Sequence, residues 1–424
     1  MEERRYKTPS GVEIYAYPNP ALHSFYISLF VKAGVMYGEG ELFGITHFLE
    51  HAAIRSVNSI EGGKLYSLLD EKGIEFNACT YNEMVQFYVS GAKEKFSIGV
   101  DVITKTLLPL SVNRKELDLE RLRIKAEIRE SDDKNSLISF TNKAIYEGTS
   151  LEGSILGTNK SVDKITLTAL EKYRKEIFSK ENIFFYVTGN FTDTDIEYLS
   201  SALSEIELSS APMRKNIAPV PAKFGKRDAY TAIKNADFTS VRISFDLDMS
   251  ELSAPCVDML YDMLLTGYNS KLFIELSEKR GLFYDLTGSA EMYSNIGVLS
   301  FGYELKEKDL EEALKLTFAI LSELKEPENA SPDFMKARYV DNAMMLLDDT
   351  RELNFTFAYD NHIIDMGFSS VEARRECYKA ITKEDIALAA AKIFKPSNLT
   401  LTVKGNKKKL DTEILRAIAK KELI

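Results

Sequence analysis

Apolar and polar residues alternate along the first strand-like segment of the chain. Four apolar residues occupy every second position between Phe25 and Val31, and the segment ends at Gly34. A repeat of two residues predicts a β-strand with one buried face. Two further strand-like runs, 74–80 and 84–91, are separated by a short polar turn. The pattern predicts antiparallel pairing of strands in this part of the chain.

Other segments repeat their apolar residues with a helical period. One helix begins near Gly44, and a second over 62–73 closes at Gly73, a typical C-terminal cap. A long helical segment over 93–108 is followed by a charged one over 113–131 that keeps leucine and isoleucine at helical spacing. The mixture of strands and helices predicts an α+β fold.

Part of this pattern occurs twice. Segment 165–190 matches segment 381–406 at a constant offset of 216 residues, including the helix, the apolar strand and the Gly-Asn pair that ends it. A second match, between 64–72 and 271–279, has an offset of 207 residues. Two matches in the same order indicate a duplicated unit. We therefore expect two homologous domains, each with helices on one face of a sheet.

The boundaries of these domains follow from composition. Segment 210–224 contains Pro212, Pro219 and Pro221 and has no apolar periodicity, so we interpret it as a linker. The sequence thus predicts an N-terminal domain over 1–209 and a C-terminal domain over 225–424. A length of 424 residues suits two domains of this size.

Charge and cysteine content exclude several classes of protein. The net charge is −10, which argues against a nucleic-acid-binding protein. Three separated cysteines indicate neither a disulfide framework nor a thiolate zinc site, and they favour a reducing compartment. The first residues have no apolar core typical of a targeting signal, and no stretch approaches the length of a membrane span. We expect a cytoplasmic protein that binds neither nucleic acid nor membranes.

The chemistry of the chain concentrates in the stretch 47–51, HFLEH. His47 and His51 are four residues apart, so on a helix both imidazoles lie on one face and can reach one metal ion. Glu50 lies beside them and is free to act as a base. A catalytic zinc site has three protein ligands and one open position. The rest of the chain must therefore supply the third ligand.

The charged helix over 113–131 offers four candidates: Glu116, Glu120, Glu127 and Glu130. Glu120 and Glu127 are seven residues apart and share one helical face, so one could bind zinc while the other supports the site. A solvated acidic face is the alternative that spacing leaves open. In the second half the single histidine, His362, has no metal-like spacing, and we interpret it as a structural or surface residue.

The HFLEH stretch is an inverted zinc motif, and the chain resembles the pitrilysin/insulinase family of zinc peptidases over nearly its whole length. It is most similar to short two-domain forms, such as bacterial peptidases related to the mitochondrial processing peptidase. The resemblance implies that Glu127, 76 residues after His51, is the third zinc ligand and that Glu120 supports it. It also implies two homologous α/β-roll domains that form half of a clamshell.

The resemblance extends to residues that would hold a peptide. In relatives, an Asn-Ala-x-Thr strand pairs with the substrate, and here Asn77, Ala78 and Thr80 match it. An arginine and a tyrosine four apart in the second half also contact substrate in relatives, and Arg280 and Tyr284 match that pair. Without the resemblance, we would interpret them as a loop arginine and a packing tyrosine.

Two departures from the family pattern concern substrate preference. The aromatic residue and the Gly-Thr pair that usually follow the second histidine are replaced by AAIRSVNS, and Val85 stands where a threonine is common.

The implied function is zinc-dependent hydrolysis of peptides or unfolded segments, with one Zn²⁺ per chain and Glu50 as the general base on zinc-bound water. The resemblance further implies a homodimer that encloses a chamber. Two alternatives remain open, which are a dedicated peptidase that matures a secreted or modified peptide and a non-catalytic scaffold subunit of the same family.

Overall fold

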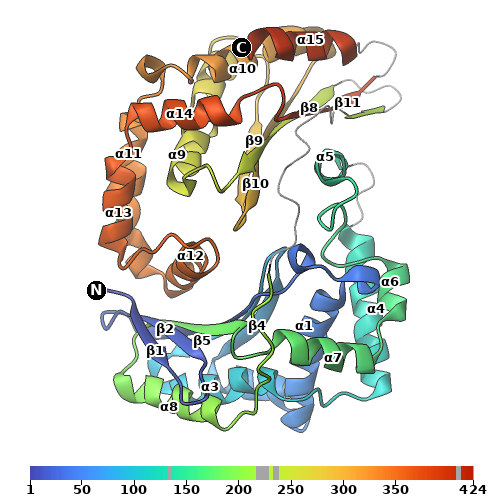
Figure 1. Ribbon diagram of the computed structural model, residues 1–424, viewed down its shortest axis with the longest axis vertical. Helices are drawn as coiled ribbons and strands as arrows, with labels where there is room; N and C mark the ends of the chain where they lie inside the picture. The colour runs from blue at the N-terminus through green and yellow to red at the C-terminus, as the bar shows by residue number, and fades with distance from the viewer. Residues whose placement is uncertain (132–135, 216–228, 233–237, 407–411, 424) are drawn as a thin grey trace. The chain divides into compact units, whose positions relative to one another are not determined.

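A computed structural model describes residues 1–131, 136–215, 229–232, 238–406 and 412–423 (Figure 1). The chain forms two compact units, each assembled from segments that are distant in sequence. The first unit comprises Met1–Asp132, Thr149–Ala218 and Met344–Val371, and the second comprises Asp133–Gly148, Pro219–Ala343 and Glu372–Ile424.

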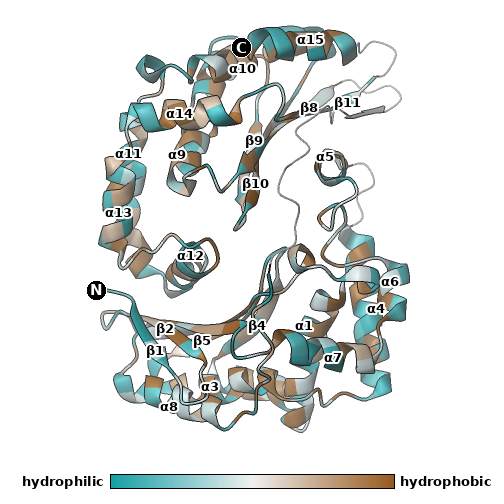
Figure 2. Cartoon of the chain, in the orientation of Figure 1, coloured by the Kyte–Doolittle hydropathy of each residue, from teal (hydrophilic) through white to brown (hydrophobic). Residues whose placement is uncertain are grey.

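The first unit contains a six-stranded sheet in the order β1-β2-β6-β3-β5-β4 (Figure 1). All neighbours are antiparallel except β2 and β6. The end strand β1 is hydrophilic, whereas the sheet is more hydrophobic towards its centre (Figure 2). The strands are β1 (Arg4–Lys7), β2 (Glu13–Pro18), β3 (Ser24–Val31), β4 (Glu75–Thr80), β5 (Val85–Ala92) and β6 (Ile183–Gly189).

Helices cover one face of this sheet and bury its main hydrophobic core. The core takes Phe25, Ile27, Leu29 and Val31 from β3, the four residues whose alternation predicted the strand. The helices of this unit are α1 (Ile45–Ile60), α2 (Leu65–Lys72), α3 (Phe96–Thr104), α4 (Arg114–Ser131), α6 (Asn159–Lys164), α7 (Leu167–Ile177), α8 (Asp193–Ser204) and α12 (Thr350–His362).

The prediction that β3 has only one buried face was wrong. Its other face is buried too, because α12 packs against β3 and β6 there. Asn354 of α12 is fully buried; its Oδ1 accepts a hydrogen bond from Ser28 Oγ (2.6 Å), and its Nδ2 donates to Tyr186 O (2.9 Å). His362, the last residue of α12, packs on the same face of the sheet, where its ring stacks on that of Tyr15 with 3.6 Å between the ring centroids.

The second unit repeats this design. Its five strands lie in the order β7-β11-β8-β10-β9, with β7 and β11 parallel, which matches β2-β6-β3-β5-β4 strand by strand. The expected α+β duplication is therefore present in the fold. The strands are β7 (Ala229–Ala232), β8 (Thr239–Asp248), β9 (Leu286–Met292), β10 (Ile296–Leu305) and β11 (Leu399–Gly405).

Helices of the second unit cover the core face of its sheet, and α5 packs on the other face. Thr141 of α5 and Thr402 of β11 share a hydrogen bond between their Oγ1 atoms (2.5 Å). The duplicated segment 271–279 contains a π-helix, Phe273–Glu278, where the first unit has α2. The α-helices are α5 (Leu137–Tyr146), α9 (Ala254–Leu265), α10 (Leu310–Glu323), α11 (Asp333–Val340), α13 (Val371–Ala380), α14 (Lys383–Ile393) and α15 (Thr412–Glu422).

The compact units differ from the continuous ranges 1–209 and 225–424 because two helices are exchanged. α5 comes from the first half of the sequence and belongs to the second unit, while α12 comes from the second half and belongs to the first. The two helices occupy corresponding places in the repeat. The predicted linker over 210–224 lies partly outside the described residues.

Among the helices that the structure describes, none combines the length and the apolar character that crossing a membrane requires.

Candidate metal centre

Helix α1 carries His47, Glu50 and His51, and its first turn is held in place from outside the helix. Gly44, immediately before the helix, has φ of 90°, a conformation that favours glycine. The Glu39 carboxylate accepts hydrogen bonds from the backbone N–H groups of Gly44 (2.7 Å) and Thr46 (3.1 Å). An acidic group at a helix N-terminus accepts hydrogen bonds from unpaired N–H groups and interacts favourably with the positive end of the helix dipole. Glu39 therefore helps to position the helix that bears the histidines.

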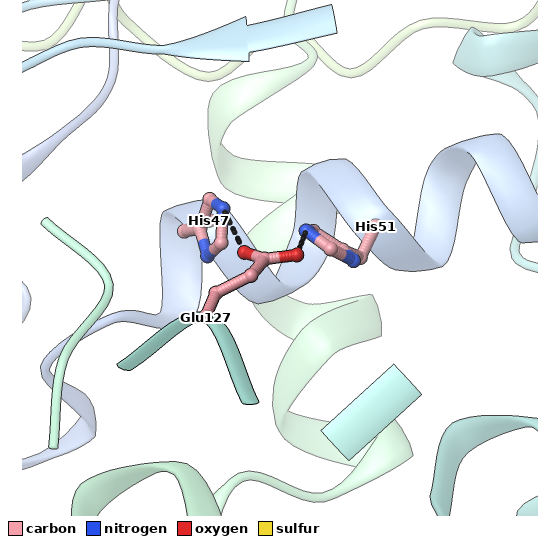
Figure 3. A group of neighbouring side chains, drawn as sticks. All are labelled: His47, His51 and Glu127. Carbon is pink, nitrogen blue, oxygen red and sulfur yellow. Dashed lines mark ion pairs between the residues drawn. The ribbon is translucent and has the colours of Figure 1, made fainter. Parts of the chain in front are cut away.

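The structure brings His47, His51 and Glu127 together (Figure 3). Each side chain offers one atom that could bind a metal, and these three atoms lie within 4.8 Å of one another. His47 Nε2 lies 3.5 Å from Glu127 Oε2, and His51 Nε2 lies 3.5 Å from Glu127 Oε1. Zinc bonds of about 2.0–2.1 Å in a tetrahedron separate neighbouring ligand atoms by about 3.3 Å. The two distances from Glu127 to the histidines are thus close to those between zinc ligands.

The protonation of the two imidazoles differs. Burial, and then the charge of His51, lowers the pKa of His47 to about 3, so its ring is neutral at physiological pH and able to bind a metal. Burial alone would lower the pKa of His51, but its hydrogen bond to Glu120 and the charges of the surrounding carboxylates raise it. His47 Nδ1 is buried and has no hydrogen-bond partner among the described residues. One neutral imidazole, a second imidazole and a carboxylate form a donor set that zinc accepts.

Glu120 contacts the ring nitrogen of His51 that faces away from Glu127. Its Oε2 lies 3.3 Å from His51 Nδ1, and its Oε1 accepts a hydrogen bond from Arg55 Nε (2.7 Å). Arg123 also donates to Glu120 Oε1 (3.1 Å). Burial would raise the pKa of Glu120, but the hydrogen bonds from His51 and Arg55 lower it, so the side chain is a carboxylate. A carboxylate on the second nitrogen of a metal-binding histidine fixes the ring and its tautomer.

We expect Glu120→Gln to weaken zinc binding by about tenfold to a hundredfold, the usual effect of losing such a supporting carboxylate. Competition with a coloured chelator measures this affinity. The matched control is Glu116→Gln on the same helix, because Glu116 bonds to Ser59 and the Asn113 backbone and not to either histidine. Equal zinc affinity in both variants would show that Glu120 does not support zinc binding.

Glu50 lies on the same helix, with only 7% of its surface exposed. Its Oε2 accepts a hydrogen bond from Thr80 Oγ1 of β4 (2.5 Å). Burial raises the pKa of Glu50, and the hydrogen bond from Thr80 opposes this effect in part. A buried carboxylate next to a metal-binding group is suited to accept and return a proton.

The residues expected to hold substrate lie in both units. Asn77 and Ala78 lie on β4, which ends its sheet and, among the described strands, pairs with β5 alone. The backbone N–H of Ala78 bonds to the Asn77 side chain (2.9 Å). In the second unit, Arg280 donates to Glu275 O (2.6 Å), and Tyr284 is 94% exposed.

Sequence reasoning missed Arg55 and Glu39. Arg55 follows His51 by four residues and so shares its helical face, which is a signal that spacing could have given. Glu39 lies in an irregular segment, where the sequence offers no period to place it. Glu130, the remaining candidate ligand, is exposed and lies outside the metal-binding group among the described residues.

Comparison with known families identifies the class of the chain. Residues 15–159 match the model of the insulinase family, peptidase family M16, and residues 164–333 match the model of the M16 inactive domain. The chain therefore belongs to the pitrilysin/insulinase-like M16 family. The histidine-containing motif falls within the first match.

Curated relatives are named as zinc proteases. The chain is 24% identical over 300 residues to the uncharacterized zinc protease YmxG of Bacillus subtilis, an alignment that covers 70% of this chain and 72% of that protein. It is 23% identical over 419 residues to an uncharacterized zinc protease of Rickettsia bellii, covering 94% and 97% of the two chains. These names support a metalloprotease that uses zinc.

Solved structures share the fold. A protease from Helicobacter pylori superposes with a TM-score of 0.81 at 17% identity, covering 95% of this chain and 99% of that one. The periplasmic protease PqqL of Escherichia coli gives a TM-score of 0.82 at 18% identity, covering 99% of this chain and 50% of that one. Because the sequence identity is low, these similarities show a shared two-unit fold and nothing further.

Proposed function

We propose that this chain is a zinc-dependent endopeptidase that hydrolyses peptides or unfolded polypeptide segments. The proposal rests on His47, His51 and Glu127, whose donor atoms lie within 4.8 Å of one another, beside the buried carboxylate of Glu50. These three residues would hold the metal, and Glu120 would fix the ring of His51. The names of the relatives support the same reaction.

Bound zinc would supply Lewis-acid chemistry, which polarises a peptide carbonyl and makes water a better nucleophile. Glu50 accepts a proton from the attacking water at its carboxylate and returns it to the leaving amine. Thr80 Oγ1 holds one Glu50 oxygen by a hydrogen bond, which leaves the other oxygen for the water.

The peptide would lie along β4. An edge strand has unpaired backbone groups on one side, and an extended peptide gains main-chain hydrogen bonds by pairing with it. Asn77, Ala78 and Thr80 provide this edge. Binding through the backbone demands an extended substrate and little specific sequence, which favours unfolded segments over folded proteins.

Arg280 and Tyr284 would steady the peptide backbone or the developing oxyanion. Following the family resemblance, we propose that two chains form a homodimer enclosing a chamber, in which this pair of one chain serves the zinc site of the other. Light scattering should therefore give about twice the 47.9 kDa mass of the chain, and a fully active monomer would contradict this arrangement.

Metal removal tests the proposal directly. The purified protein should contain about one zinc per chain by elemental analysis and should cleave a quenched, unstructured peptide. Dialysis against a chelator should abolish cleavage, and one equivalent of zinc should restore it. Magnesium serves as the control, because a site with two imidazoles does not suit that ion.

The other outcomes separate the alternatives. Zinc without cleavage of general peptides would favour a maturation peptidase with one natural substrate. A protein that binds no zinc would contradict the proposal and favour a scaffold subunit.

A further inference from the structure

The second unit contains a cavity of about 1030 Å³ that no residue of the candidate metal centre lines. Residues of α5, β8 and β10 and the segment 281–287 line it. One of them is Tyr284, which the proposed function assigns to substrate binding. The cavity is large enough to take one or more side chains of a peptide.

Arg242 on β8 lines this cavity and is 8% exposed. It alternates with the core residues Val241 and Ile243, so its side chain lies on the opposite face of the sheet. Gly302 lies directly across from it on β10. Because that position has no side chain, the guanidinium reaches over it to Ser289 of β9, where Nη2 donates a hydrogen bond to Oγ (3.2 Å).

The guanidinium of Arg242 lacks an anionic partner in the part of the chain that the structure describes. Among the described residues, its Nε has no hydrogen-bond partner, and the guanidinium contacts the neutral hydroxyl of Ser289 and no carboxylate. A buried charge without a counter-charge is costly. Burial lowers the pKa of Arg242, and the charge of Glu291 offsets this effect in part. Glu291 does not line the cavity and accepts a hydrogen bond from Tyr293 OH (3.0 Å).

Other charged residues line the cavity, but they are less buried than Arg242. The acids outnumber the lysines by one, and all of these residues lie partly or fully in solvent, where screening weakens their fields. Glu304 is also hydrogen-bonded to Ser240 Oγ (2.5 Å). The lining acids are Asp285, Glu304 and Asp309, and the lining lysines are Lys306 and Lys404.

Three large apolar side chains line the same cavity and remain exposed. Ile138 is 53% exposed, Phe238 is 56% exposed and Tyr284 is 94% exposed. Exposed apolar residues that gather around a hollow mark a binding surface. A buried cation together with apolar walls suits a group that has an aliphatic stem and a carboxylate end.

We propose that this cavity is a substrate subsite in which Arg242 binds a carboxylate of the peptide, either an acidic side chain or the C-terminal carboxylate. The inference rests on the proposed peptidase function and adds a preference to it. The guanidinium forms charge-assisted hydrogen bonds through its free Nε–H and its neighbouring N–H groups. The apolar residues contact the rest of the bound side chain.

Binding can be measured without catalysis by using the Glu50→Gln protein and labelled peptides in fluorescence anisotropy. One peptide set moves a single glutamate along a neutral sequence, with glutamine at the same positions as the comparison. A second set compares a C-terminal acid with a C-terminal amide. In one of the two sets, we expect the peptide with the carboxylate to bind about tenfold to a hundredfold more tightly than its neutral counterpart. This is the range expected for a hydrogen bond to a charged group.

Arg242→Met in the same background should remove this preference and change the affinity for the neutral peptide by less than about threefold. Arg242→Lys should keep part of the preference, because it retains the charge but not the geometry of the guanidinium. Lys306→Met is the matched control, since it removes a positive charge from the same cavity. An equal loss of preference in the Lys306 variant would contradict the assignment to Arg242.

Equal binding of all acidic and neutral peptides by the Glu50→Gln protein would overturn the carboxylate subsite even if the Arg242 variants do not fold. If the wild-type protein still cleaves those peptides, the peptidase proposal stands without the subsite. Preferential binding of a carboxylate by a protein that cleaves nothing would support the subsite and count against the peptidase.

Discussion

The Glu50→Gln variant is expected to lose peptide cleavage by about a hundredfold to ten-thousandfold while keeping about one zinc per chain. Glutamine has nearly the same shape as glutamate and still accepts a hydrogen bond from Thr80, but it cannot take a proton from water. Loss of a positioned general base typically costs this factor. Because the proposed ligands are His47, His51 and Glu127, the metal should remain. The measurement combines elemental analysis with the initial rate on a quenched peptide.

Glu71→Gln is the control for this experiment. Glu71 lies on α2, is exposed and does not belong to the candidate metal centre. Its variant should match the wild type in zinc content and rate. Undiminished cleavage by the Glu50 variant would remove Glu50 from the reaction, and loss of its zinc would assign Glu50 a role in holding the metal.

Replacing Glu127 by alanine should have the second large effect. Two histidines from one helical turn would remain, and two ligands hold zinc much more weakly than three. We expect zinc affinity to fall by more than the roughly hundredfold that follows loss of a supporting carboxylate. Cleavage should fall with it, and a large excess of zinc should restore little, because the carboxylate also orients the site. Chelator competition and isothermal calorimetry measure the affinity.

Glu130→Ala provides the matched control, since Glu130 is exposed on the same helix and lies three residues away. It should bind zinc as the wild type does. If the Glu127 variant kept its zinc affinity, the third ligand would have to come from elsewhere. Loss of zinc in the Glu130 variant instead would point to a different rotation of α4 against α1.

The local part of the site could be predicted from the sequence because it depends on helix geometry alone. Residues four apart share a helical face, so His47 and His51 can be paired without knowing the fold. The same reasoning could not choose among the four glutamates of α4, because the choice depends on how α4 packs against α1. The resemblance to the zinc peptidase family selected Glu127 at this point, and the structure places its carboxylate 3.5 Å from both imidazoles.

By itself, the sequence determined the duplicated α+β design, the strand carrying Phe25 and Val31, and the helix bearing HFLEH. These features follow from periodicities that repeat within a few residues or along a copied segment. Only the tertiary structure decided that α5 and α12 are exchanged between the two units. A pattern of apolar residues shows that a helix face is buried, but it does not identify the sheet that buries it.

The same limit applies to single polar residues. Arg242 follows the alternation of β8 and looks like one solvent-facing residue among several in the sequence. Its burial, its reach past Gly302 and its missing counter-charge arise from neighbouring strands that are about 45 to 60 residues away along the chain. Contacts between distant segments are set by packing of the whole unit, and a short-range sequence pattern carries no information about them.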